Sequence, residues 1–181
     1  MATGSIIGGG IDGGAKVAGE SGPAAAPAIV TPASAADLDA LVRLEEASFV
    51  GDRLSRRSYR RLLRASSAAI LAARAGGGAI TGSLVLLFRK GSASARIYSV
   101  AVDPSARKAG IGRQLMAAAE GVAAARGART IRLEVRADNA AAIRLYEALG
   151  YAVTGRVEGY YADGEAAVLM ARTLPTAEDA A

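Results

Sequence analysis

Hydrophobic and polar positions follow two different periods along this chain, and segments of the two kinds alternate. Short apolar or alternating runs predict strands near residues 28–31, 68–74, 79–89, 96–102, 130–136, 151–158 and 165–173. Apolar residues spaced three and four apart predict helices over about 34–48, 55–64, 110–127 and 138–150. This order of elements predicts an α/β fold with a single mixed sheet and helices on both of its faces.

The junction between the strand at 96–102 and the helix that follows it has a pattern typical of phosphate binding. The strand ends before Pro104, since proline has no N–H to donate to a sheet. Gly110 and Gly112 allow the backbone to approach a ligand closely, and the helix start leaves amide N–H groups without partners. Basic residues surround the two glycines: Arg107, Lys108 and Arg113. The pattern predicts a phosphate or pyrophosphate site, the alternative being an ordinary helix start after a tight strand exit.

Composition excludes several kinds of chemistry. The 181 residues include no cysteine and no histidine, which excludes disulfides, thiolate nucleophiles, Ser–His–Asp triads and imidazole or thiolate zinc sites. We therefore expect no metal, and acid–base chemistry must use carboxylates, tyrosine, lysine or the backbone. The net charge of +5 suits an anionic cofactor without requiring nucleic acid. Without an apolar run long enough to span a bilayer or a secretory leader, we expect no membrane partner and a cytoplasmic location.

The two ends of the chain differ in composition from its middle. Residues 1–27 are rich in glycine and alanine without periodicity, which predicts a flexible tail or an overlong start. They contain a G-x-G-x-x-G match at 8–13, but no strand precedes it and no helix follows, so a dinucleotide site is not expected. We expect one domain over residues 28–173 and a polar tail over 174–181.

Two side chains are candidates for acid–base catalysis. Glu134 lies in an alternating strand between Arg132 and Arg136, and its alternative role is a member of a surface row of ion pairs. Tyr146 lies at helical spacing with apolar neighbours, and its alternative role is core packing. Asn139 is most simply a helix cap. The arginine-rich segment 55–64 is either a solvated helix face or a surface for an acidic partner.

Two segments together resemble the core motifs of the GNAT acetyltransferase superfamily. They are VAVDPSARKAGIGRQLM, from Val100, and LEVRADNAAAIRLYEALGY, from Leu133. The likeness covers about residues 28–173, is strongest from 97 to 164, and is closest to the bacterial ribosomal-protein-alanine N-acetyltransferases. It implies a GNAT-type sheet of about seven strands, mostly antiparallel, and an enzyme that uses acetyl-CoA without a metal.

The resemblance also implies roles for single residues. Glu134 would be the general base, and Tyr146 the general acid for the departing thiolate. The pantetheine arm would pair with the backbone of Val100, Ala101 and Val102. Main-chain amides would hold the pyrophosphate, and Asn139 would contact the cofactor arm. The pyrophosphate segment comprises Lys108, Ala109, Gly110, Ile111, Gly112 and Arg113.

The implied reaction needs no enzyme nucleophile, because an amine attacks the thioester directly. A free carboxylate, with a pKa near about 4.3, is a weak base at neutral pH, so we expect Glu134 to act through a bridging water. The acceptor is expected to be a primary amine, such as a protein or peptide N-terminus, on a monomeric or homodimeric enzyme. Two alternatives remain: an acetyltransferase for small-molecule amines, and a non-catalytic acyl-CoA-binding module. Two departures from the close subgroup, Ala166 and the basic segment 52–56, put the acceptor in question.

Overall fold

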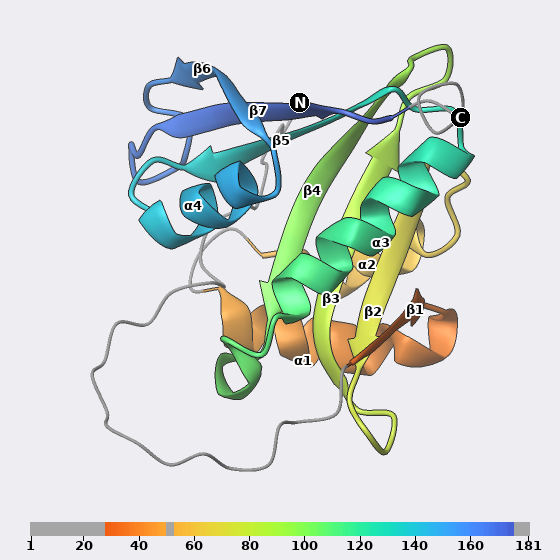
Figure 1. Ribbon diagram of the computed structural model, residues 1–181. Helices are drawn as coiled ribbons and strands as arrows, with labels where there is room; N and C mark the ends of the chain where they lie inside the picture. Colours follow the sequence, from red (N-terminus) through yellow and green to blue (C-terminus); the bar gives the residue numbers. More distant parts are fainter. Residues whose placement is uncertain (1–27, 50–52, 176–181) are drawn as a thin grey trace.

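The computed structural model describes residues 28–49 and 53–175. The described elements form one seven-stranded sheet in the order β1-β2-β3-β4-β5-β7-β6, in which only β4 and β5 pair in parallel (Figure 1). The strands are β1 Ile29–Pro32, β2 Ala68–Arg74, β3 Ile80–Phe88, β4 Ser94–Val102, β5 Thr130–Arg136, β6 Ala152–Val157 and β7 Ala167–Thr173. The helices are α1 Leu38–Ser48, α2 Arg56–Leu62, α3 Ile111–Ala125 and α4 Ala140–Ala148, with short 3₁₀ turns η1 Ala35–Asp37 and η2 Pro104–Ala106.

The expected fold class is therefore confirmed. The order of elements and the mixed, mostly antiparallel sheet agree with the pattern of the sequence, and the strands at 68–74 and 130–136 agree to the residue. The other boundaries shift by a few residues at element ends, where pairing rather than periodicity decides. The expected tail over 1–27 lies outside the described residues, as does the expected tail over 174–181 from residue 176 on. Leu174, the first residue of that tail, is instead buried in the core. Within the described ranges, no helix combines the length and apolar character that crossing a membrane requires.

The sheet separates two hydrophobic clusters, and different helices pack on each of its two faces. On one face α3 and α4 bury side chains that include Leu115, Met116 and Tyr146 against Ile131 and Leu133. On the other face α1 and α2 cover the sheet with a second cluster. Its members are Leu41, Leu44, Phe49, Leu54, Tyr59, Ile70, Val85 and Ala101. Side chains of one strand alternate between these clusters, so neighbouring residues of β5 face opposite sides.

A glycine in β3 lets α3 begin close to the sheet. A Cβ built on Gly82 would lie 2.6 Å from Cγ2 of Ile111, the first residue of α3, and 3.3 Å from the Ala101 carbonyl oxygen. A larger residue would therefore push the start of α3 away from the strands. This contact fixes the helix N-terminus against the end of β4.

The sheet opens between β4 and β5. Their parallel pairing covers only Ser94 to Arg96 of β4, opposite Thr130 to Arg132. Beyond this point β4 continues to Val102 along β3, and β5 continues to Arg136 along β7. The two strands diverge in Figure 1, with α4 beside the β5 side of the opening. No described strand pairs with the later half of β4 on its β5 side, so peptide groups there are available to a ligand.

Candidate active site

The loop from β4 to α3 is shaped by a side-chain cap and two left-handed residues. The carboxylate of Asp103 accepts hydrogen bonds from the Ser105 N–H at 2.8 Å and from the Ser105 hydroxyl at 2.6 Å. Lys108 has φ 69° and Gly110 has φ 76°, and Lys108 is the one non-glycine residue with positive φ in the described ranges. Gly110 is the N-cap of α3, so the N–H groups of the first helical turn point toward this loop without helical partners.

A pocket of about 200 Å³ lies at this helix start. Its lining includes six of the residues expected to bind the cofactor: Val102, Lys108, Gly110, Ile111, Gly112 and Arg113. Ala106, Arg107 and Leu145 of α4 complete it. Val100, Ala101, Ala109 and Asn139 are not among its lining residues. The Asn139 side chain instead caps α4, where its Oδ1 accepts the Ala142 N–H at 3.1 Å. The pocket thus joins backbone donors, positive charge and an opening between α3 and α4.

Glu134 lies on the face of the sheet that α1 and α2 cover. Its Oε2 accepts a hydrogen bond from Nε of Arg96 at 2.9 Å, and the two side chains are 15% and 18% exposed. The alternation of the strand predicted Arg132 and Arg136 as the nearest charged neighbours of Glu134. In the structure Arg132 is exposed, while Arg136 forms ion pairs with Asp138, after β5, and with Asp163, between β6 and β7. Arg96 belongs to the neighbouring strand, and only the short parallel register between β4 and β5 brings it to Glu134.

Arg96 also connects Glu134 to aromatic side chains. Its Nη2 donates to the Tyr160 hydroxyl at 3.4 Å, and its guanidinium carbon lies 5.7 Å from the centre of the Tyr98 ring. Tyr160 and Tyr161 contact each other edge to face, with ring centroids 5.1 Å apart. Burial raises the pKa of Tyr161 above its usual value, with a further contribution from Tyr160. The loop between β6 and β7 therefore forms one wall of a site around Glu134.

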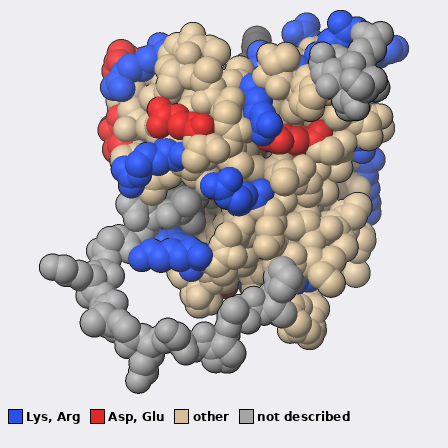
Figure 2. Space-filling model, in the orientation of Figure 1, with Lys and Arg blue, Asp and Glu red and all other residues tan. Residues whose placement is uncertain are grey.

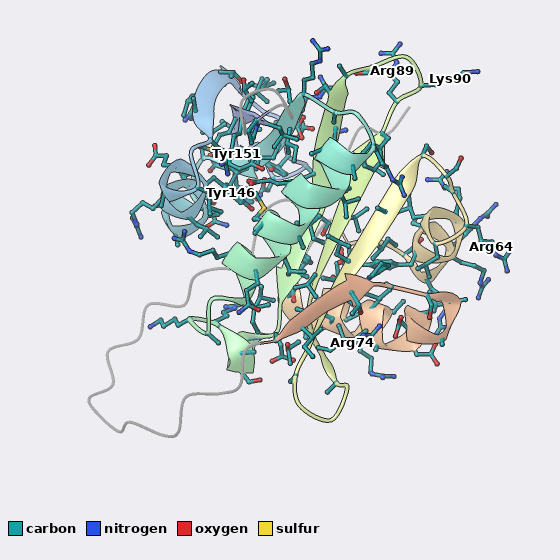
Figure 3. The ribbon with its side chains drawn as sticks, turned by 45° about the vertical axis from the view of Figure 1, so that its right-hand side comes forward. Arg64, Arg74, Arg89, Lys90, Tyr146 and Tyr151 are labelled. Atoms are coloured by element: carbon teal, nitrogen blue, oxygen red, sulfur yellow. The ribbon has the colours of Figure 1, made fainter. Side chains whose placement is uncertain are left out.

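Tyr146 lies on the opposite face of the sheet, within the cluster under α3 and α4. Its side chain is completely buried, and its ring centroid lies 6.0 Å from that of Tyr151. The two residues are labelled beside each other in Figure 3. Among the described residues, its hydroxyl has no hydrogen-bond partner. Burial raises the pKa of the Tyr146 hydroxyl, with a smaller contribution from Tyr161. A buried hydroxyl without a partner is costly, and such groups often have a ligand as their partner.

A buried carboxylate in α1 holds the segment before α2 in place. Glu45 is 1% exposed, accepts the Leu54 N–H at 2.8 Å, and accepts the Tyr59 hydroxyl at 2.8 Å. Burial raises the pKa of Glu45, which these two hydrogen bonds and Arg53 partly oppose. The sequence did not indicate this network, because a glutamate on an amphipathic helix usually faces solvent. It attaches α2 to α1 beside the later half of β4.

Comparisons with known proteins identify relatives of this chain. The model of the acetyltransferase (GNAT) family matches residues 38–151. The [Ribosomal protein bS18]-alanine N-acetyltransferase of Escherichia coli K12 is 44% identical over 80 residues, which are 42% of this chain and 54% of that protein. The N-alpha-acetyltransferase of Saccharolobus solfataricus is 43% identical over 89 residues, 49% of this chain and 51% of that protein. The chain thus matches about half the length of these curated relatives.

A solved structure extends the likeness along more of the chain. The crystal structure of the ribosomal-protein-S18-alanine N-acetyltransferase from Escherichia coli aligns with a TM-score of 0.74 at 27% identity, covering 83% of this chain and 96% of that one. The family match includes β4, α3, β5 and α4, which are the elements that form the opening and its pocket.

Proposed function

The chain belongs to the GNAT acetyltransferase family, and from that premise we propose that it transfers the acetyl group of acetyl-CoA to a primary amine, the N-terminus of a protein or peptide. One observation carries the proposal. At the opening between β4 and β5, the carboxylate of Glu134, 15% exposed, lies on one face of the sheet. On the other face lies the buried hydroxyl of Tyr146, which has no hydrogen-bond partner among the described residues. An amine that approaches from the first face would lose its proton there, while the leaving group would meet a donor on the second.

The residues of the opening fit acetyl-CoA. The unpaired side of β4 from Val100 to Val102 suits an amide-containing arm, which would add to the sheet as an extended segment does. The helix start at Gly110 suits the pyrophosphate, because free N–H groups and the helix dipole favour negative charge. Lys108 and Arg113 add full charges at the same pocket. Acetyl-CoA supplies an activated thioester, so the chain needs no nucleophile of its own.

Glu134 acts as the base for the attacking amine. An N-terminal ammonium has a pKa of about 7.7 to 8.0, so only a minority of it is neutral near pH 7. Glu134 removes the remaining proton, directly or through one water, which its 15% exposure permits. Arg96 holds the carboxylate in a fixed position through its Nε.

Tyr146 stabilises the departing sulfur. Because burial raises the pKa of its hydroxyl, Tyr146 stays protonated at neutral pH and remains a donor. A thiol has a usual pKa of about 8.5, so complete transfer of the phenolic proton to the thiolate is unfavourable. Tyr146 therefore acts chiefly through a hydrogen bond that forms as negative charge develops on sulfur. That none of the described residues bonds this hydroxyl is consistent with a partner that arrives with the substrate.

The proposal is tested by measuring thiol release from acetyl-CoA with the purified full chain, a set of peptides and a set of small amines. We expect peptide N-termini to react and the reaction to weaken in Glu134→Gln and in Tyr146→Phe. Turnover of small amines alone would favour a small-molecule acetyltransferase. Binding of acetyl-CoA without turnover of any amine would make the chain a binding module and refute the proposal.

A further inference from the structure

Helix α2 and the residues just after it carry several arginines for which the described part of the chain supplies no acidic partner. Its seven residues, Arg56–Leu62, and the two that follow present exposed guanidinium groups on one side, while Tyr59 is buried against α1. We call the arginine face the four residues Arg57, Arg60, Arg61 and Arg64. In the described ranges none of the four forms an ion pair or a side-chain hydrogen bond, whereas Arg56 pairs with Asp39. Figure 3 shows Arg64 extending from α2 away from the sheet.

This arrangement lowers the stability of a short helix. Residues three and four apart are neighbours on a helix, so Arg57 faces Arg60 and Arg61, and Arg64 faces the same pair. Like charges at such spacings destabilise a helix by about 0.2–0.5 kcal/mol per pair. No acidic residue lies in α2 to offset the repulsion. A partner with negative charge would relieve it.

The arginine face is continuous with the site around Glu134. Tyr98 of β4 packs against the same hydrophobic cluster as Leu62, the residue after Arg61. Burial raises the pKa of the Tyr98 hydroxyl, and the positive charges of Arg96 and, more weakly, Arg61 oppose this. Arg96 in turn contacts Tyr98 through its guanidinium and Glu134 through Nε. In the described structure Arg96 uses two of its five N–H donors, on Glu134 and Tyr160, which leaves three for a carboxylate. Positive charge therefore extends from the candidate base to α2.

The opposite face of the sheet has a different distribution of charge. Figure 2 views the molecule from the side of α3 and α4, where basic and acidic groups are interspersed. On that face Arg172 of β7 forms an ion pair with Glu120 of α3. The arginine face lies on the other side of the sheet, from which we expect the amine to approach.

We propose that the acceptor is the N-terminus of an acidic polypeptide, with a carboxylate in its first residues bound by Arg96 and later carboxylates bound by the arginine face of α2. This inference rests on the proposed function. A polypeptide fits better than a nucleic acid, because the charged surface leads to an amine-accepting site and the one aromatic residue of α2, Tyr59, is buried and cannot stack on a base.

The test compares three peptides of equal length with the same first residue and with acidic, neutral or basic residues at positions 2–6. The kcat/KM of each is measured by thiol release at low and high salt, with the wild-type chain and with the triple variant Arg57→Gln, Arg60→Gln, Arg61→Gln. Exposed ion pairs contribute about 0.2–1 kcal/mol each, so we expect about a tenfold preference for the acidic peptide at low salt. The preference should fall in high salt and in the triple variant, while the neutral peptide reacts equally with both proteins.

Arg89→Gln is the matched control, because Arg89 is an exposed arginine of the β3–β4 turn, away from α2 in Figure 3. It should leave the preference unchanged. Arg96→Gln should remove the part of the preference for acidic peptides that depends on position 2. A series of peptides with a single acidic residue, placed at each of positions 2–6 in turn, measures the contribution of each position. Equal or faster reaction of neutral and basic peptides would overturn this inference and leave the proposed function intact. Binding of an oligonucleotide to the arginine face with no charge preference among peptides would also overturn it. No reaction with any peptide would instead refute the proposed function.

Discussion

The Tyr146 hydroxyl offers a test in which activity and stability change in opposite directions. Tyr146→Phe removes one oxygen atom that is completely buried and has no hydrogen-bond partner among the described residues. The ring and its contact with Tyr151 remain, so no cavity larger than the lost oxygen forms. A residue kept for packing alone would lose nothing by this change.

The structure gives the expected size of both effects. Burying a hydroxyl without a hydrogen bond costs about 1–3 kcal/mol by mutational measurements, so the free energy of unfolding should rise by about 1 kcal/mol in Tyr146→Phe. For a domain of this size, that corresponds to a Tm higher by about 2–4 °C. Loss of a donor to the leaving group should lower kcat by about 100-fold, the lower end of the range for removal of one hydrogen-bond donor to a developing negative charge.

Thermal unfolding without ligand and thiol release with saturating acetyl-CoA measure the two effects on the same preparation. Tyr151→Phe is the matched control, since its buried hydroxyl donates to Oε1 of Glu120 at 3.4 Å and lies outside the proposed chemistry. It should lower stability slightly and leave kcat unchanged. A less stable Tyr146→Phe protein with normal turnover would show that the hydroxyl serves folding, and the proposed role of Tyr146 would be wrong.

Three further changes test other parts of the site. Glu134→Gln should lower kcat at pH 7 by about 100-fold with little change in acetyl-CoA affinity, and the loss of kcat should be smaller at pH 9, where the amine is already neutral. Glu147→Gln, at an exposed position, is the control. A loss of acetyl-CoA affinity as large as the loss of kcat would indicate a structural role for Glu134. Gly110→Val should weaken acetyl-CoA binding about tenfold in a calorimetric titration, because φ 76° strains any residue with a Cβ, whereas Gly76→Val, with open space around its Cβ, should not. Glu45→Gln should be the more stable protein at pH 7. Burial raises the pKa of Glu45 in the folded state, so the stability of the wild-type protein increases as the pH falls through that pKa, and the stability difference between the two proteins shrinks. Urea unfolding from pH 7 to 4.5 measures this difference. A difference that stays constant over that range would contradict a raised pKa for Glu45.

The sequence predicted the elements well because their signals are local. The glycines at the ends of α3 and α4 and the alternation in β5 depend on residues a few positions apart. The pocket at Gly110 was predictable for the same reason, since its strand, loop and helix start are contiguous. The roles of Glu134 and Tyr146 came from the resemblance to a family and remain predictions.

Contacts between distant segments could not be predicted in this way. Arg96 is 38 positions from Glu134, and nothing in the alternation of either strand indicates that the two strands pair for only three residues. The buried network of Glu45 with Tyr59 depends likewise on how α2 packs on α1. Sequence reasoning instead assigned neighbours from the same strand to Glu134, because alternation places them on the same face.

In the proposed reaction, the short parallel pairing of β4 with β5 would let one carboxylate and one phenol act on the same substrate from opposite faces of the sheet. In a fully paired sheet, the backbone would separate Glu134 from Tyr146, and neither could reach a molecule bound by the other. Because the ladder stops at Arg96, a substrate arm can take the place of the missing partner strand and expose its reactive end to both faces. The same interruption leaves Arg96 at the edge of the opening, where it binds Glu134 and lies over the Tyr98 ring. The residue that ends the pairing is therefore the one that we propose distinguishes acceptors by charge.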